Sequence, residues 1–330
     1  MIFSVAPTRI TLGGGGTDLK SYYSKYGGFL IAGAINKYCT VTANKRFYES
    51  IRVSYHRRTE IVDNPSQIDH PIFREALKLC GIDKQIELVS IADVPAQSGL
   101  GASSSFTVAL LNALHTYKRE LVAREQLAEE ACYLEIDVLG EHVGKQDQYM
   151  AAFGGLTCLT FEKDGKVIVE PLRVSDEVVD QLENNLLLFF TGREREASSI
   201  LVEQDEKSRK EDSQMLENLH QVKEIGLQTR KYLEGGQIHM LGELFHIHWE
   251  LKKKRSKKMT DPFIDECYEV ARKNGAIGGK LIGAGGGGFF LFYTPNAERP
   301  KLISTLQKMG LRWERFHFDF DGVRIAAYLK

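Results

Sequence analysis

Glycine is bunched along this chain, and the bunching constrains the fold more than any other feature of the sequence. The 30 glycines include separate clusters at Gly13 to Gly16, Gly99 with Gly101, Gly154-Gly155, Gly278-Gly279, and Gly283 with Gly285 to Gly288. A residue without a Cβ lets the backbone turn sharply or approach another group closely. One such cluster predicts a tight turn. Several clusters in a chain whose net charge is only -1 favour an enzyme that binds phosphate through its backbone.

Length and composition narrow the class of protein. A chain of 330 residues exceeds what one hydrophobic core comfortably holds, so we expect two lobes that share a cleft. With 43% hydrophobic and 26% charged residues, the chain is typical of a globular protein and not of a disordered or fibrous one. The balanced charge indicates neither a nucleic-acid partner nor an anionic membrane partner, so an anionic ligand must be held locally.

The sequence predicts a cytoplasmic protein. The longest uncharged apolar stretches, such as Leu186 to Phe190, are far shorter than the roughly 20 residues of a membrane-spanning helix. The N-terminus has no signal-peptide pattern. The five cysteines are scattered, which fits reduced thiols and argues against a structural zinc site.

Hydrophobic periodicity predicts an α+β fold. In the first half we expect strands at 2–12, 29–44 and 86–91, a helix from Ser103, a second helix over 127–138, and a hairpin of 156–161 with 167–170. In the second half we expect a buried strand at 185–191, a long helical stretch at 193–233, helices at 238–254, 263–274 and 299–309, a strand on each side of the last glycine run, and a closing hairpin turned at Asp321-Gly322. The change of pattern near residue 185 divides the chain into domains at 1–184 and 185–330.

The segment from Pro95 to Ser105 is the strongest candidate for binding an anion. Gly99 and Gly101 lead directly into the predicted helix, whose first turn has unpaired N–H groups and the positive end of the helix dipole. The alternative is that one serine simply caps the helix. The three consecutive serines Ser103 to Ser105 and two glycines exceed what a cap requires, so we expect a polyphosphate site.

Two other phosphate motifs fail on their context. The stretch from Gly140 to Lys145 is one residue short of a P-loop and lacks the following Ser or Thr. Gly283 to Gly288 satisfies G-x-G-x-x-G, but the residues that follow it are typical of a strand and not of the helix that a dinucleotide site requires. An oxidoreductase is therefore a distant alternative.

Two acids and one basic run are further candidates. Glu135 lies on the predicted helix over 127–138, and Asp147 follows twelve residues later. Carboxylates suit a magnesium ion that bridges nucleotide phosphates, and a positioned carboxylate can accept the proton of an attacking hydroxyl. The basic run from Lys252 to Lys258 predicts a solvated helix end, with a phosphate clamp as the alternative.

Three segments together resemble the GHMP kinase superfamily. They are Ala6-Pro7-Thr8-Arg9-Ile10 with Gly15, Thr17 and Asp18, then Pro95 to Ser105, and finally Gly279 to Gly288. The resemblance covers nearly the whole chain. It implies a two-lobed α+β fold with an N-terminal lobe like domain 2 of ribosomal protein S5, a ferredoxin-like C-terminal lobe, and the active site in the cleft.

The resemblance also implies a role for each matching residue. ATP would be bound by Pro95, Ser98, Gly99, Leu100, Gly101, Ala102, Ser103 and Ser104. Mg²⁺ would be held by Ser103 and Glu135, Asp147 would be the catalytic base, and Arg9 would stabilise the transferring phosphoryl group. The acceptor would be bound by Thr8, Gly14, Gly15, Thr17, Asp18, Asp147, Arg193, Gly285 and Gly286. The third segment would approach the second and line the cleft.

Within the superfamily, the first segment looks most like the D-glycero-D-manno-heptose 7-phosphate kinase group. Gly14-Gly15-Gly16-Thr17-Asp18 stands where galactokinases have Gly-Glu-His-Thr-Asp, so two galactose-contacting side chains are absent. The acceptor implied is a sugar phosphate, whose own phosphate needs a cation from Arg193, Arg195, Lys252 or Lys20. A fucose or mannose kinase and a non-catalytic sensor of sugar and ATP are alternatives. Both a monomer and a homodimer stay open.

Overall fold

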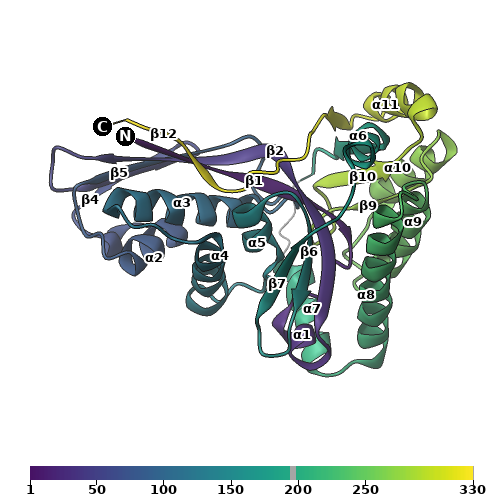
Figure 1. Cartoon of the computed structure of the whole chain (residues 1–330), viewed down its shortest axis with the longest axis horizontal. Helices are drawn as coiled ribbons and strands as arrows, with labels where there is room; N and C mark the ends of the chain where they lie inside the picture. Colours follow the sequence, from purple (N-terminus) through teal and green to yellow (C-terminus); the bar gives the residue numbers. More distant parts are fainter. Residues whose placement is uncertain (194–197, 330) are drawn as a thin grey trace.

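A computed structural model describes residues 1–193 and 198–329. Two sheets and their helices account for most of the chain (Figure 1). The strands are β1 (Ile2–Gly13), β2 (Gly28–Lys45), β3 (Ile51–Tyr55), β4 (Arg58–Val62), β5 (Ile86–Ala92), β6 (Leu156–Phe161), β7 (Val167–Pro171), β8 (Leu186–Phe190), β9 (Gly278–Leu281), β10 (Phe289–Tyr293), β11 (Arg312–Glu314) and β12 (Arg324–Tyr328). The α-helices are α1 (Lys20–Tyr26), α2 (Pro71–Leu79), α3 (Ala102–Lys118), α4 (Arg124–Cys132), α5 (Gln146–Phe153), α6 (Asp176–Asn185), α7 (Ser198–Arg209), α8 (Ser213–Glu234), α9 (Met240–Lys253), α10 (Pro262–Lys273) and α11 (Arg299–Lys308).

The first sheet is built around the long strand β2. Its strands run in the order β12-β1-β2-β5-β3-β4, while β6 pairs with the first part of β2 and β7 pairs with β6. All pairs are antiparallel except β3 with β5. Helix α3 packs on β1 and β2, and with α2, α4 and α5 it covers one face of the sheet (Figure 1). This arrangement brings the middle of β1 beside the start of α3, where the Arg9 N–H donates to the Leu100 carbonyl and the Ser105 hydroxyl donates to the Pro7 carbonyl.

The second sheet has the order β11-β8-β10-β9 and is antiparallel. The runs LLLFF in β8 and FFLFY in β10 are buried almost throughout, because residues of α9, α10 and α11 pack on one face of these central strands and residues of the first sheet pack on the other. Continuous apolar runs are what a strand covered on both faces requires. The α+β fold with two lobes is confirmed, and so are the hairpin of β6 with β7 and the strands on each side of the last glycine run.

The predicted closing hairpin is wrong. Asp321-Gly322 does lie in a turn, in which the Asp319 carboxylate accepts hydrogen bonds from both backbone N–H groups. The strands before and after it belong to different sheets, because β11 pairs with β8 while β12 pairs with β1. The proposed domain boundary at 184/185 therefore separates β8 to β11, which form the second sheet, from the strands before them. The last strand, β12, returns to the first sheet.

Two helical predictions are also refined. The stretch expected as one helical region at 193–233 contains two helices, α7 and α8, because the Asp212 side chain accepts a hydrogen bond from the Met215 N–H and begins α8. Helix α4 continues as a π-helical segment over Tyr133–Val138, which is where Glu135 lies. π-helical turns are frequent at functional sites. No helix within the described residues is long and apolar enough to cross a membrane.

Candidate active site

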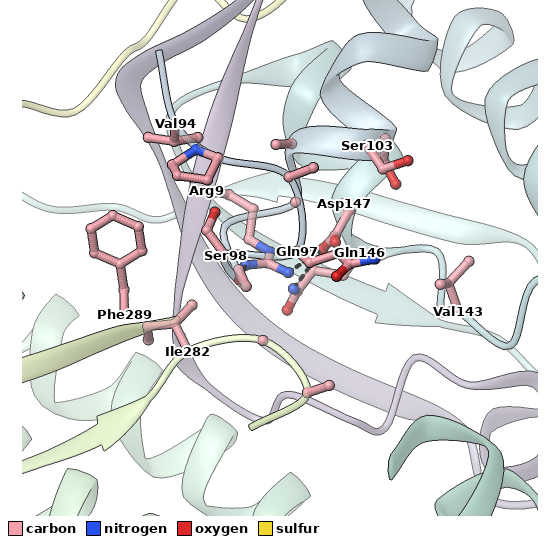
Figure 2. Close-up of a pocket in the computed structure, with 18 of the residues that line it drawn as sticks. Arg9, Val94, Gln97, Ser98, Ser103, Val143, Gln146, Asp147, Ile282 and Phe289 are labelled. Carbon is pink, nitrogen blue, oxygen red and sulfur yellow. Dashed lines mark hydrogen bonds and ion pairs between the residues drawn. The ribbon is translucent and has the colours of Figure 1, made fainter. Parts of the chain in front are cut away.

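A cavity of about 1150 Å³ lies between the two lobes. Its walls come from β1, the loop before α3, the π-helical segment and α5 on one side, and from α7, α9, β9 and the last glycine run on the other. Figure 2 shows the part where Arg9, Asp147 and the loop side chains meet. Deep clefts lined by both lobes are the usual place for a small-molecule site.

The loop before α3 presents an open helix N-terminus to this cavity. Gly101 has φ +78°, a left-handed conformation, and no side chain caps the helix. The Ser98 hydroxyl is buried and has no hydrogen-bond partner within the described residues. Because the serines do not cap α3, its first N–H groups and the Ser98 hydroxyl are available to an anion. This geometry favours phosphate binding over the capping alternative.

The last glycine run packs directly on the loop, as predicted. A Cβ on Gly99 would lie 2.5 Å from the carbonyl oxygen of Ile282, and one on Gly283 would lie 2.5 Å from the Gly99 Cα. A Cβ on Gly288 would lie 2.2 Å from the Ser98 carbonyl oxygen. Only glycine permits these backbone contacts, so the two glycine segments form one wall of the cavity.

Arg9 and Asp147 form an ion pair at the centre of the site. The Arg9 Nε and one terminal nitrogen lie 2.7 and 2.6 Å from the Asp147 Oδ1, and another terminal nitrogen donates to the Gly99 carbonyl at 2.6 Å (Figure 2). The Gln146 side chain also donates to Oδ1, at 2.9 Å. The other carboxylate oxygen, Oδ2, faces Gly101, whose Cβ would lie 3.0 Å from it. Oδ1 is therefore fixed, while Oδ2 remains open to a reacting proton.

Asp18 lies at the other end of the first glycine run. Its carboxylate accepts hydrogen bonds from the backbone N–H groups of Gly16, at 3.1 Å, and Gln146, at 3.3 Å. Burial, and then the negative charge of Asp147, raise the pKa of Asp18. Gly144 leaves room for this carboxylate, since a Cβ there would lie 1.9 Å from Oδ2. A polar acceptor thus stands beside the ion pair.

Comparison with known proteins identifies the family. The model of the GHMP kinases N terminal domain matches residues 71–155, and that of GHMP kinases C terminal matches residues 229–310. A protein of Campylobacter jejuni named D-glycero-alpha-D-manno-heptose 7-phosphate kinase is 31% identical over 96% of this chain and 96% of its own length. The chain belongs to the GHMP kinases. It is an enzyme that uses ATP as phosphate donor, as the resemblance implied.

Solved structures of other GHMP kinases agree with this fold. A D-glycero-D-manno-heptose 1-phosphate kinase from Bacteroides thetaiotaomicron superposes with a TM-score of 0.84 at 26% identity and covers 100% of both chains. A putative sugar kinase from Campylobacter jejuni gives a TM-score of 0.79 at 28% identity, over 98% of this chain and 97% of its own.

Glu135 is the candidate magnesium carboxylate of this GHMP kinase. It is buried beneath the loop and accepts hydrogen bonds from Ser104 at 2.7 Å, Thr107 at 2.5 Å and Gln148 at 2.5 Å. Burial raises the pKa of Glu135 to about 7. Within the described residues, no three His, Cys, Asp or Glu side chains are arranged to hold a metal ion. The site nevertheless fits Mg²⁺, which keeps waters and binds through one or two carboxylates plus substrate phosphates.

The two serines at the start of α3 occupy different environments. Ser103 is exposed and lines the cavity, whereas Ser104 is buried and spends its hydroxyl on Glu135. Ser103 is thus free to meet a ligand, and Ser104 positions the carboxylate. Ser103 and Glu135, the predicted metal pair, line the same cavity, but the serine that hydrogen-bonds to Glu135 is Ser104.

The structure brings most predicted site residues to the cavity. Its lining includes Arg9, Gly15, Asp18, Pro95, Ser98, Gly99, Gly101, Ala102, Ser103, Ser104, Glu135 and Asp147. Outside the lining are Thr8, Gly14, Thr17, Leu100, Arg193, Gly285 and Gly286. Thr17 instead ties the glycine run to β2 through Gly14 and Phe29 carbonyls, and Thr8 donates to the Lys37 carbonyl. These residues hold the wall and do not face the cavity.

Sequence reasoning missed two groups of lining residues. Aromatic side chains Tyr55, His70 and Phe106 line another part of the cavity, and His70 packs edge-on against both of the others. The expected solvated helix end is wrong for Lys252 and Arg255, which are buried and face the cavity. The missed signal is the spacing of His248, Lys252 and Arg255, which places them on one helical face.

Proposed function

We propose that this GHMP kinase transfers the γ-phosphate of ATP to the anomeric hydroxyl of D-glycero-D-manno-heptose 7-phosphate. The product would be the 1,7-bisphosphate, a precursor in GDP-heptose synthesis. The observation that carries the chemistry is the Arg9–Asp147 pair, whose Oδ2 is open beside the N-terminus of α3. The 31% identity to the Campylobacter jejuni heptose 7-phosphate kinase, over nearly all of both chains, supports this acceptor.

In this proposal the wall formed by the loop before α3 and the start of α3 binds ATP. The N–H groups at the start of α3 and the Ser98 hydroxyl bind the ATP phosphates, because they are unpaired donors at a helix N-terminus. Ser103 and Glu135 would hold Mg²⁺, which would neutralise charge on the phosphate oxygens. The aromatic part of the cavity, with Tyr55 and Phe106, is suited to a purine ring.

The second part of the proposal concerns proton transfer. The acceptor oxygen forms a bond to Pγ while the bond from Pγ to the bridging β-γ oxygen breaks, and ADP leaves. The hydroxyl proton passes to the open Oδ2 of Asp147. The Arg9 guanidinium, 4% exposed and beside the reacting atoms, stabilises negative charge on the transferring group. Asp18 accepts a hydrogen bond from a sugar hydroxyl.

The proposal includes a cytoplasmic location and a sugar-phosphate substrate. All five cysteines are free and buried, which suits a compartment where thiols stay reduced. ATP is also available there. Monomer and homodimer are both compatible with the proposal, since every residue it uses comes from one chain.

A panel of acceptors tests the assignment. ADP release from Mg-ATP is measured with heptose 7-phosphate, mannose 6-phosphate, unphosphorylated heptose, mannose, fucose and galactose. We expect turnover on heptose 7-phosphate to exceed that on each of the four unphosphorylated sugars by at least about 100-fold, because a site built for a polar group rejects analogues that lack it. Equal or faster turnover on a free sugar would contradict the heptose 7-phosphate assignment and indicate a kinase of the fucose or mannose type. ATP binding without turnover on any of them would favour the sensor.

A further inference from the structure

Three cations lie buried in the cavity wall formed by α9 and β9, across the cavity from the lobe that contains Asp147. Lys252 at the end of α9, Arg255 just after it and Lys280 on β9 are 6%, 4% and 2% exposed, and all three line the cavity. None of them has a carboxylate within 4.0 Å among the described residues. Buried Lys and Arg side chains are almost always paired, so this cluster requires an explanation.

Neutral groups orient the three cations. Lys252 donates to the carbonyls of Leu281 and Gly283. Lys280 donates to the Leu12 carbonyl and to His248 Nδ1, each at 3.1 Å. A lysine ammonium has three N–H donors, so each lysine retains one beyond these bonds, although the Lys280 Nζ also lies 4.7 Å from the centre of the Phe245 ring.

Arg255 is held in the same way. Its Nε donates to the Asn218 side chain at 2.9 Å, while its terminal nitrogens lie 3.4 Å from the Gly15 carbonyl and one of them also lies 3.4 Å from the Gln204 Oε1. These terminal contacts are long for hydrogen bonds. The fork of the guanidinium is therefore positioned but only weakly satisfied.

The charges of this wall do not balance. Burial, Arg255 and Lys280 push the pKa of Lys252 well below its usual range, and burial, Arg255 and Arg9 do the same to Lys280. Among the described residues, Arg9 is already neutralised by Asp147, and the acid that acts on this cluster is Asp18, next to Arg255. Three cations facing one carboxylate leave an excess that a dianionic group would neutralise.

We propose that Lys252, Arg255 and Lys280 form the subsite that binds the phosphate group already present on the acceptor. The inference rests on the proposed function and names the part of the cavity that selects a phosphorylated sugar. Arg255 lies against Gly15, beside Asp18, at the end of the cavity assigned to the sugar. The planar Arg255 fork and two ammonium groups match the several oxygens of a phosphate.

The other cations considered from the sequence are less suited. Arg193 forms an ion pair with Asp261 and stacks on Phe263, and it lies outside the cavity lining. Lys20 is exposed at the start of α1 and also lies outside the lining. Arg195 falls outside the described residues.

Binding measurements without nucleotide test the subsite. Calorimetric titrations compare heptose 7-phosphate, unphosphorylated heptose and inorganic phosphate on the full chain and on Arg255→Gln and Lys252→Gln. The matched control is Lys254→Gln, because Lys254 stands in the same basic run but is exposed. We expect both subsite variants to lose about tenfold to 100-fold in affinity for heptose 7-phosphate, as loss of a charged hydrogen bond predicts. Lys254→Gln should keep the original affinity, and Mg-ATP affinity should be unchanged in all three.

Three results would overturn the inference. They are affinity for heptose 7-phosphate unchanged in folded Arg255→Gln and Lys252→Gln, equal losses for Mg-ATP and the sugar phosphate, or no preference of the original chain for the phosphorylated heptose. Arg255→Lys keeps the charge and removes the fork, so it supplies a folded variant if Arg255→Gln unfolds; an intermediate loss is expected and an unchanged affinity would contradict the subsite. Because the binding measurements need no turnover, a failed kinase assay with intact phosphate binding would contradict the proposed function but not the phosphate subsite.

Discussion

At the scale of single residues, the site depends on how each carboxylate is used. Asp147 spends Oδ1 on Arg9 and Gln146 and leaves Oδ2 open, whereas Glu135 has hydrogen bonds to both oxygens. The first arrangement suits a group that must accept a proton. The second suits a group that must stay fixed while its charge changes.

Asp147→Asn tests the first of these roles. The amide keeps the size of the side chain but cannot accept the hydroxyl proton, so kcat should fall by about 10²- to 10⁴-fold. Mg-ATP affinity should change little, and the amide oxygen can still accept from Arg9, but the melting temperature should fall because the buried Arg9 loses the charge that neutralises it. Steady-state kinetics with heptose 7-phosphate, alongside a nucleotide titration, measures both quantities. Turnover within tenfold of the original would remove Asp147 as the base.

Glu135 makes the stability of the ligand-free kinase depend on pH. Burial raises the pKa of Glu135 from 4.5 to about 7, so between these values the folded state binds more protons than the unfolded state. The free energy of unfolding should therefore fall as pH rises from 4.5 to 7, by an amount on the order of 3 kcal/mol from this one group.

Urea unfolding at several pH values measures that slope, with Glu135→Gln as the comparison. The variant should lose this part of the pH dependence and be more stable than the original at pH 8 without Mg-ATP. Gln148 can accommodate it, since its Oε1 is buried without a hydrogen-bond partner within the described residues and can accept from the new amide. Parallel pH profiles for the two proteins would contradict the assignment.

At the scale of elements, two glycine segments must touch for the phosphate loop to keep its shape. Gly283 has φ +71° and packs against Gly99, whereas Gly140 has φ +70° and nothing within 4 Å of a Cβ. Both positions carry the same backbone strain on substitution, but only the first adds a collision.

Comparison of Gly283→Ala with Gly140→Ala isolates that collision. We expect about 1–2 kcal/mol of destabilisation for Gly140→Ala from backbone strain, and about 1–3 kcal/mol more for Gly283→Ala from overpacking. Gly283→Ala should also raise KM for ATP, because the displaced loop contains Ser98 and Gly99. Chemical denaturation and ATP kinetics measure these effects. Equal destabilisation with an unchanged KM would show that the contact does not shape the loop.

The elements that sequence predicted are those with long, regular patterns. The strands β1 and β2 and helix α3 have enough residues to reveal their period, while the short strands β8 and β10 are continuous apolar runs. The elements β3, β4, α1, α2, α5 and α6 were missed. Four of them, β3, β4, α1 and α5, have only five to eight residues, whereas the apolar residues of α2 and α6 recur at helical spacing and offered a usable signal. The closing hairpin was wrong because Asp321-Gly322 determines a local turn, while the pairing of β12 with β1 depends on residues more than 300 positions apart.

The candidate site divides in the same way. Arg9, Asp147, Glu135 and the loop were predicted because the family motifs contain them, and the structure places all of them on one cavity. Lys252 and Arg255 belong to a basic run that composition alone assigns to solvent. The spacing of His248, Lys252 and Arg255 places them on one helical face, but their burial depends on the packing of α9 against β9, which that spacing does not report.

At the scale of the whole molecule, one core joins the two lobes. A cluster of buried side chains includes Ile10 and Ile31 of the first sheet together with Leu188 and Leu291 of the second, and Phe245 of α9 packs within it. Because this core lies next to the cavity, it holds the proposed ATP-binding loop before α3 at a fixed separation from the cluster of Lys252, Arg255 and Lys280. That separation would select an acceptor with a phosphate at one end and a hydroxyl at the other.

The position of the new phosphate tests this account most directly. Heptose 7-phosphate is converted with Mg-ATP, and the purified product is analysed by mass spectrometry and by ¹H–³¹P correlation NMR. The account predicts a bisphosphate whose new phosphorus couples to the anomeric proton. A product phosphorylated at another hydroxyl, or a diphosphate formed on the existing phosphate, would contradict it.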